Sequence, residues 1–118
     1  MAIPNLNAPT KVEGKNATQA IGTSATAIVT NSAASDKTFR IVGLWVSNVD
    51  GASAADVNVD INNASGTRHV AKTVSVPADA TIEVIGPRPL YLMEGDSLRL
   101  TASASGDLEA VCSYEEIT

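Results

Sequence analysis

Apolar and polar residues alternate along short stretches of this chain, and turn-forming residues separate the stretches. In the segment 97–104 every second residue from Leu98 onward is apolar, and the pattern resumes at Leu108 after the turn Ser105-Gly106-Asp107. A period of two places the apolar side chains on one face of an extended strand. These two segments are therefore predicted to be strands that form a β-hairpin.

The same kind of segment recurs through the rest of the chain, and helical periodicity is absent. Clusters of Gly, Asn, Asp, Ser and Pro lie between the segments, at the spacing typical of an all-β domain. We predict a two-sheet β-sandwich of about eight short antiparallel strands, of jelly-roll or immunoglobulin-like type. The predicted strands cover residues 11–20, 25–31, 37–48, 56–62, 67–76, 80–86, 89–93, 97–104 and 108–115.

The segment 37–48 differs from the others because both of its faces are apolar. One face of an extended strand would carry Phe39, Ile41 and Trp45, and the other would carry Val42, Leu44 and Val46. A strand with one face in water would alternate apolar with polar residues, so this strand is predicted to be covered on both faces. The domain's own core would supply one cover, and a neighbouring subunit is a candidate for the other.

Residues 1–10 contain two prolines and two asparagines and little apolar content. Proline cannot pair regularly in a central strand, so we predict an extended N-terminal arm that is free to lie across another surface, with a frayed terminus as the alternative. A single β-sandwich domain would then occupy residues 11–118. The arm and the second face of the strand at 37–48 together give a candidate assembly interface, which consists of Ile3, Pro4, Leu6, Val42, Leu44 and Val46.

The composition points to a thin core and to association. The chain has 118 residues, enough for one domain, and only 3% of them are aromatic, so the core must be mainly aliphatic with Trp45 and Phe39 as its largest side chains. Small side chains bury little apolar surface each, which favours added stabilisation by oligomerisation. The net charge of −5 argues against a nucleic-acid partner and against an anionic membrane.

Targeting signals and cysteine chemistry are not indicated. The amino terminus lacks a basic start followed by a long apolar run, so we expect no secretion signal, and no segment is apolar enough to span a membrane. The single cysteine, Cys112, excludes an internal disulfide and a cysteine-based metal cage. It continues the apolar alternation of its segment and is predicted to be a buried thiol.

One short motif points to hydrolase chemistry but lacks the necessary partners. The residues Gly95-Asp96-Ser97-Leu98 match the nucleophile motif of the GDSL esterases, a family in which the motif opens a much longer α/β domain and a late Asp-x-x-His supplies the base. The one histidine here, His69, precedes the serine and lacks that spacing. The segment 93–96 is instead interpreted as a tight turn in which Gly95 adopts the strained dihedral.

Acidic residues give no convincing metal site. The row Asp56, Asn58, Asp60 and Asn62 resembles the start of a calcium loop, but Ile61 and Thr67 occupy the places that require Gly and Glu. Alternating valines indicate a straight strand with an acidic, amide-rich outer face, followed by a turn at 62–66. The pair Glu115-Glu116 is interpreted as a solvated end of the chain. We expect no catalytic residue, no metal and no cofactor.

Taken together, the chain resembles the small virion structural proteins of tailed bacteriophages. The resemblance spans roughly residues 25–118 and rests on the Pro-containing arm and on many short strands rich in Ala, Ser and Thr. It also rests on three runs: Pro87-Arg88-Pro89-Leu90-Tyr91-Leu92-Met93-Glu94-Gly95-Asp96-Ser97-Leu98, Leu100-Thr101-Ala102-Ser103-Ala104 and Ser113-Tyr114-Glu115-Glu116-Ile117. Members of this group decorate capsid shells, close the head-tail joint or form tail and fibre parts, often as β-sandwiches.

The resemblance implies a non-enzymatic function in the virion, assembled in the host cytoplasm. The first hypothesis is a capsid decoration (cement) protein that binds the major capsid protein, bridges capsomers and forms a homo-oligomer. Two alternatives remain open: a head-tail adaptor or tail or fibre component, and a receptor- or carbohydrate-binding module. Sugar sites usually expose aromatic rings, and the alternation suggests that most of the few aromatic residues here are buried, which favours the first hypothesis.

Overall fold

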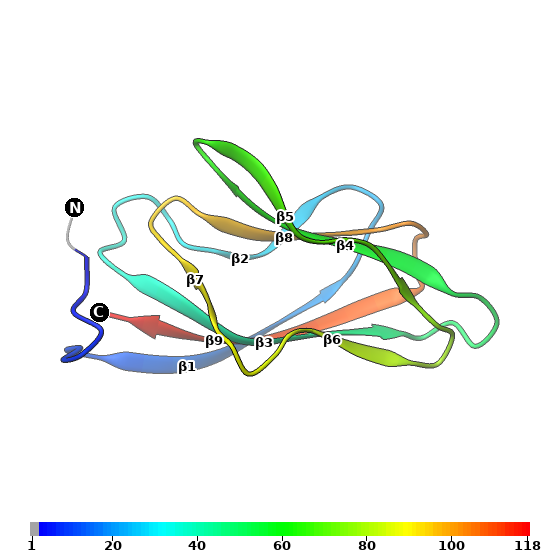
Figure 1. Cartoon of the computed structure of the whole chain (residues 1–118), viewed down its shortest axis with the longest axis horizontal. Helices are drawn as coiled ribbons and strands as arrows, with labels where there is room; N and C mark the ends of the chain where they lie inside the picture. The colour runs from blue at the N-terminus through cyan, green and yellow to red at the C-terminus, as the bar shows by residue number, and fades with distance from the viewer. Residues whose placement is uncertain (1–2) are drawn as a thin grey trace.

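The computed structural model describes residues 3–118, and these residues form nine β-strands and no helix (Figure 1). The strands are β1 (Val12–Ala20), β2 (Thr26–Thr30), β3 (Thr38–Asn48), β4 (Ala55–Asn63), β5 (Gly66–Val76), β6 (Thr81–Ile85), β7 (Leu90–Leu92), β8 (Ser97–Ala102) and β9 (Leu108–Ile117). Each begins and ends within two residues of its predicted segment. Apolar alternation together with the turn residues between the segments therefore located every strand.

The strands form two antiparallel sheets that pack face to face (Figure 1). Sheet A has the order β1-β9-β3-β6, with β7 also paired to β3, and sheet B has the order β2-β8-β4-β5. The pairs nest, with β1 on β9 outermost, then β2 on β8, then β3 on β6 and β7, and β4 on β5 innermost. This nesting defines a jelly roll. In an immunoglobulin-like sandwich the first two strands share a sheet, whereas here they lie in different sheets.

The predicted hairpin between the segments 97–104 and 108–115 is wrong. The turn at 105–107 is present, with a φ of 82° at Gly106, but it carries the chain from β8 in sheet B to β9 in sheet A. Both strands point their alternating apolar residues, such as Leu98 and Leu108, into the space between the sheets. Alternation reports which face of a strand is buried and carries no information about its pairing partner.

The central strand β3 contains a bulge that changes which of its residues are buried. Ile41 pairs with Tyr114 of β9 and Gly43 pairs with Ser113, so Val42 is an extra residue with no partner. One extra residue reverses the in-out alternation of every residue that follows it. The predicted division of residues between the two faces is therefore wrong for the residues that follow Val42.

The bulge removes two of the predicted interface residues from the surface. Leu44 and Val46 are 0% exposed and belong to the core between the sheets, whereas Trp45 faces outward. Leu44 and Val46 consequently cannot contact a partner in the folded domain. Trp45 is also not the large core residue that the composition suggested. The largest fully buried side chains are Ile and Leu, as in Ile41 and Leu44.

Two buried asparagines anchor the loops at the two ends of β3. The side-chain amide of Asn31 donates hydrogen bonds to the carbonyls of Lys37 and Leu92, at 2.9 and 3.0 Å. Asn48 does the same at the other end of the strand, where its amide reaches a loop carbonyl and the last carbonyl of β5. Since a buried carbonyl without a donor is costly, these side chains fix the loops in place.

The N-terminal segment is only partly as predicted, and residues 1–2 lie outside the described residues. Residues 3–10 contain no strand, but Ala8 N–H donates to the carbonyl of Asn5 at 3.1 Å, so a turn interrupts the predicted extended arm. Thr10 N–H then donates to the carbonyl of Thr118, which attaches the arm to the end of the chain. Within residues 3–118 no helix has the length and apolar character needed to cross a bilayer.

Candidate assembly surface

The outer face of sheet A carries a group of exposed apolar side chains at its centre. Val42, Trp45 and Val111 are 39%, 37% and 43% exposed. Trp45 of β3 lies directly opposite Val111 of β9, and opposite residues in an antiparallel pair share one face of the sheet. Val42 joins them because the bulge turns it outward. We call Val42, Gly43, Trp45 and Val111 the outer patch.

Gly43 is the floor of the outer patch, and its lack of a side chain lets the indole of Trp45 lie along the strand. A Cβ atom placed on Gly43 would be 2.9 Å from both Cζ2 and Cζ3 of Trp45, and still closer to Cη2. Gly43 itself is buried, although it is on the outer face. The indole therefore covers the Gly43 backbone and presents its other side to solvent. A large, flat and half-exposed aromatic ring is typical of the residues that dominate binding energy at interfaces.

Replacing Gly43 with Ala is expected to displace the Trp45 ring while preserving the fold. The new methyl group would occupy the space of the indole, and the ring can rotate into solvent, so we expect a loss of about 1 kcal/mol or less in the free energy of unfolding. Because Trp45 is the only tryptophan, its fluorescence should shift to longer wavelength. Gly22→Ala is the control, because a Cβ there meets no atom within 4 Å. Unchanged emission in Gly43→Ala would contradict this account of Gly43.

Charged groups border the outer patch on both sides. The guanidinium of Arg40 on β3 donates to the Glu115 carboxylate on β9 at 2.7 Å, and this hydrogen bond, followed by one with Tyr91, raises the pKa of Arg40. On the far side Glu83 of β6 lies opposite Trp45. An apolar centre within a polar rim is the usual arrangement of a protein-protein contact surface.

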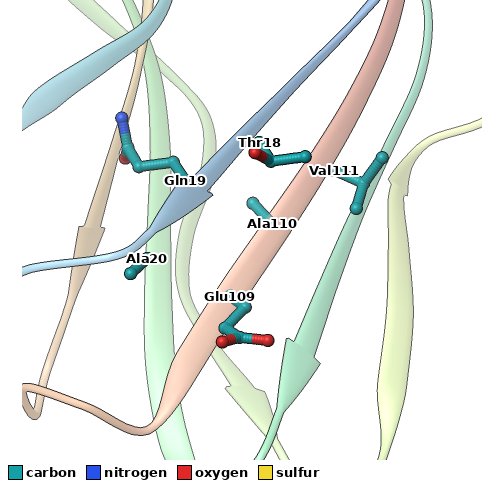
Figure 2. Close-up of a pocket in the computed structure, with 6 residues that line it drawn as sticks. All are labelled: Thr18, Gln19, Ala20, Glu109, Ala110 and Val111. Carbon is teal, nitrogen blue, oxygen red and sulfur yellow. The ribbon is translucent and has the colours of Figure 1, made fainter.

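An open depression of about 360 Å³ adjoins the outer patch where β1 ends and β9 begins (Figure 2). Val111 belongs both to the outer patch and to the lining of this depression. The Gln19 side chain at this depression donates from its amide to the carbonyl of Ala27 at 3.0 Å, which connects β1 of sheet A to β2 of sheet B. The depression is lined by Thr18, Gln19, Ala20, Glu109, Ala110 and Val111.

The structure disperses the candidate interface residues instead of bringing them together. Ile3 and Leu6 are exposed on the arm, at 71% and 45%, and Pro4 is half-buried there. Val42 alone lies on the outer patch. Trp45 was predicted to lie in the core, and Val111 was given no role, so neither was among the predicted interface residues. Val111 could have been found, because it is an apolar residue in the polar half of an alternating segment.

The segment that matches the esterase motif forms the predicted turn. Gly95 has a φ of 86°, and the Asp96 carboxylate accepts the N–H of Met93 at 2.9 Å, which closes the turn. The Ser97 hydroxyl lies 3.3 Å from that of Thr30 on the neighbouring strand β2. These contacts give Asp96 and Ser97 structural partners.

The acidic row on β4 is less exposed than predicted. Asp60 is 4% exposed, and its carboxylate accepts a hydrogen bond from Nε of Arg99 on β8 at 2.8 Å. The same guanidinium donates to the hydroxyl of Thr67 on β5 at 3.2 Å. One ion pair therefore connects three neighbouring strands of sheet B. Among residues 3–118 no group of three or more His, Cys, Asp or Glu side chains is arranged to hold a metal ion.

The interpretation of Glu115-Glu116 as a solvated acidic end is wrong. Glu115 pairs with Arg40, and Glu116 is 8% exposed between two lysines. Lys15 on β1 and Lys37 before β3 donate to its two carboxylate oxygens at 2.9 and 2.8 Å. Burial alone would raise the pKa of Glu116, but the hydrogen bonds from Lys37 and Lys15 outweigh it and lower the pKa below its ordinary value of 4.5.

The lowered pKa of Glu116 should make the folded protein less stable in acid. A carboxylate whose pKa is lower in the folded than in the unfolded chain stabilises the fold above the unfolded pKa, and the contribution is lost as the pH falls through the folded value. We therefore expect the melting temperature to fall on acidification below about pH 4.5. Glu116→Gln should be less stable at neutral pH and should lose less on acidification. If the melting temperatures of the two proteins fell equally between neutral pH and acid, this role of Glu116 would be contradicted.

The fold can be compared with known proteins, although sequence comparison finds nothing. No protein-family model matches the chain, and no curated protein is similar to it in sequence. Among solved structures, a chain from Bacillus endospore appendages, which form disulfide-linked pili, matches with a TM-score of 0.53 at 11% identity, over 92% of this chain and 87% of that one. A chain from the acid-stable capsid of Helicobacter pylori bacteriophage KHP30 matches with a TM-score of 0.52 at 6% identity, over 94% and 90%.

Both neighbours belong to structural assemblies, a pilus and a capsid, and at these identities the likeness shows the fold alone. The surface of residues 3–118 exposes no thiol for a disulfide of the kind named for the pili. Cys112 is the single cysteine, and it is buried as predicted, with burial raising the pKa of its thiol to about 12. A thiol of this kind is protonated and unreactive in the folded protein.

Proposed function

We propose that this chain is a non-enzymatic structural subunit of a bacteriophage virion, and that it acts as a capsid decoration protein. The observation that carries the proposal is the outer patch: a half-exposed tryptophan, flat on a rigid sheet and flanked by Val42 and Val111. Major capsid protein is the proposed partner, and the outer patch would contact it where capsomers meet. The jelly-roll topology and the two structural neighbours, a capsid chain and a pilus chain, support this reading.

The outer patch exposes apolar surface to water, and covering that surface in a contact would be favourable. Tryptophan and neighbouring aliphatic groups release water when they are covered, and a central tryptophan surrounded by a polar rim commonly supplies most of the binding energy. The ion pair of Arg40 with Glu115 and the acid Glu83 would form that rim. Since the patch lies on paired strands, little conformational entropy is lost when it docks.

The direct test is reconstitution of shells that lack this chain with purified variants, followed by quantitative mass spectrometry of the particles. Trp45→Ser and Val111→Ser should remove the chain from the particle. Val74→Ser is the matched control, because Val74 is an equally exposed valine, at 36%, on β5 of sheet B. Full binding of Trp45→Ser would overturn the proposal. A copy number close to that of the major capsid protein indicates decoration. A copy number that matches the subunits of a single ring indicates a head-tail adaptor or tail component.

A carbohydrate- or receptor-binding module is the second candidate, and one observation favours it. Trp45 and Tyr91 are both exposed on the outer face of sheet A, at 37% and 38%, although Trp45 had been expected to lie in the core. Flat exposed rings are the usual platform for sugar rings. This function would be favoured by a glycan screen that gives specific hits which are lost in Trp45→Ser and in Tyr91→Ala. It would also require that the chain does not bind to the particles in the reconstitution experiment.

A further inference from the structure

Five strands of residues 3–118 lie at the edges of the two sheets, and only one of them is both long and regular. The edge strands are β1, β6 and β7 in sheet A and β2 and β5 in sheet B, and β7 has only three residues. β2 and β6 have five residues each, and both carry a register shift. β5 has eleven residues but two register shifts against β4. β1 pairs with β9 over nine consecutive residues with no shift.

Proteins protect edge strands from unwanted pairing with bulges, charges and prolines. β5 has such protection: its bulged half contains Lys72 and Thr73, and Thr73 has a φ of 52°. β1 has no bulge and no proline, and its second half, residues 16–20, has no charge. An edge of this length with neither a bulge nor a proline is a template for another strand.

The hydrogen bonds at the start of β1 show which of its backbone groups are unused by the sheet. Lys11 and Thr118 exchange both backbone hydrogen bonds, at 3.3 and 2.9 Å. In an antiparallel ladder such pairs recur at every second residue, so the odd-numbered residues of β1 point their N–H and C=O groups at β9. The even-numbered residues, which include Gly14 and Asn16, therefore point theirs at the free edge.

We propose that β1 pairs with β1 of a second copy of this chain, antiparallel and about a two-fold axis at Gly14. This register places Glu13 opposite Lys15 of the other copy, so that two reciprocal opposite-charge pairs form, and the ammonium of each Lys15 also donates to Glu116 of its own chain. An axis at Lys15 would place the two Lys15 side chains opposite one another, and an axis at Asn16 would form no charge pair. A Cβ on Gly14 would meet no atom within 4 Å, so the face of β1 at the proposed axis is uncrowded.

The consequence is a continuous sheet A across the dimer, with both outer faces on the same side. Since Glu13 and Lys15 of opposite copies must share one face of the joined sheet, the two-fold axis is perpendicular to that sheet. The two Trp45 rings then point toward one surface. The dimerisation does not rest on the proposed decoration function, but two patches facing one shell would bind it with higher avidity than one.

The test measures the oligomeric state by sedimentation equilibrium over a range of concentrations. Asn16→Pro removes an N–H that is directed at the free edge and leaves the pairing of β1 with β9 intact, so it should give a folded monomer. Asn16→Ala keeps the N–H and should remain a dimer. Trp45→Ser should also remain a dimer, which separates this proposal from the proposed function. A wild-type monomer at all concentrations, or a dimer unchanged by Asn16→Pro, overturns the proposal.

A charge exchange tests the register independently, including the case in which Asn16→Pro fails to fold. Glu13→Lys alone places lysine opposite Lys15, and Lys15→Glu alone places glutamate opposite Glu13, so each variant should dimerise more weakly than wild type. An equimolar mixture should restore the dimer as a heterodimer, because its cross-strand pairs are again of opposite charge. Because Lys15→Glu also removes one of the two lysine donors to Glu116, thermal melts followed by circular dichroism first establish that each variant is folded at the temperature of the measurement. A mixture that associates no better than its components excludes this register.

Discussion

Leu44→Asp is expected to unfold the protein, whereas Val42→Asp, two residues earlier on the same strand, is expected to leave it folded. Leu44 is 0% exposed between the sheets, and an isolated carboxylate there has neither water nor a cation. We expect a loss of about 4 kcal/mol or more, a large part of the total stability of a small domain. Val42 is 39% exposed on the bulge, where a carboxylate stays hydrated, so the expected change is about 0.5 kcal/mol.

Urea denaturation of the two variants, followed by circular dichroism, measures this difference. The comparison is well matched because residue type at the two sites is similar and both lie on β3. Val42→Asp should in addition fail to bind its partner through the outer patch. Equal stability of the two variants would contradict the bulge at Val42, since a regular strand would place both side chains on one face.

The second large effect is expected from Arg99→Leu in sheet B. The variant leaves the Asp60 carboxylate, 4% exposed, without the guanidinium that lies 2.8 Å from it. Removing one partner of a buried ion pair is strongly destabilising, and we expect a loss of about 2–4 kcal/mol, since Arg99 itself retains some contact with solvent.

The double variant Asp60→Leu with Arg99→Leu is the control for this prediction. Removing both charges removes the uncompensated carboxylate, so the double variant should be more stable than Arg99→Leu alone. Thermal melts of the wild type, both single variants and the double variant complete the cycle. Additive losses in the cycle would show that the two side chains do not interact in solution.

The strand positions and the fold class follow from local features of the sequence. Alternation of apolar residues located β8 and β9, and turn residues such as Gly95 and Gly106 marked where strands end, since their positive φ angles are accessible at little cost only to glycine. The same local pattern predicted a buried Cys112. Each of these features depends on a few neighbouring residues and on the two-residue period of the β-strand.

Pairing and exposure depended on residues that are distant in sequence. Whether β9 follows β8 in a hairpin or crosses to the other sheet depends on which strands bury each other's faces, and alternation is identical in both cases. The bulge at Val42 appears only when β3 is set against β9, and it exchanged the predicted environments of Leu44 and Trp45. The candidate site was therefore predicted only in part: Val42 was found, while Trp45 and Val111 were missed.

What the sequence by itself determined is the set of strands and, in strands without a bulge such as β8, the buried face, because a two-residue period is a property of the extended backbone. The tertiary structure alone decided the jelly-roll order, the buried Glu116 between Lys15 and Lys37, and the exposed Trp45 over Gly43. These features arise where strands meet. Their energies come from contacts between segments, such as ion pairs across strands and an added residue on one side of a ladder, and no local pattern in a single segment encodes them.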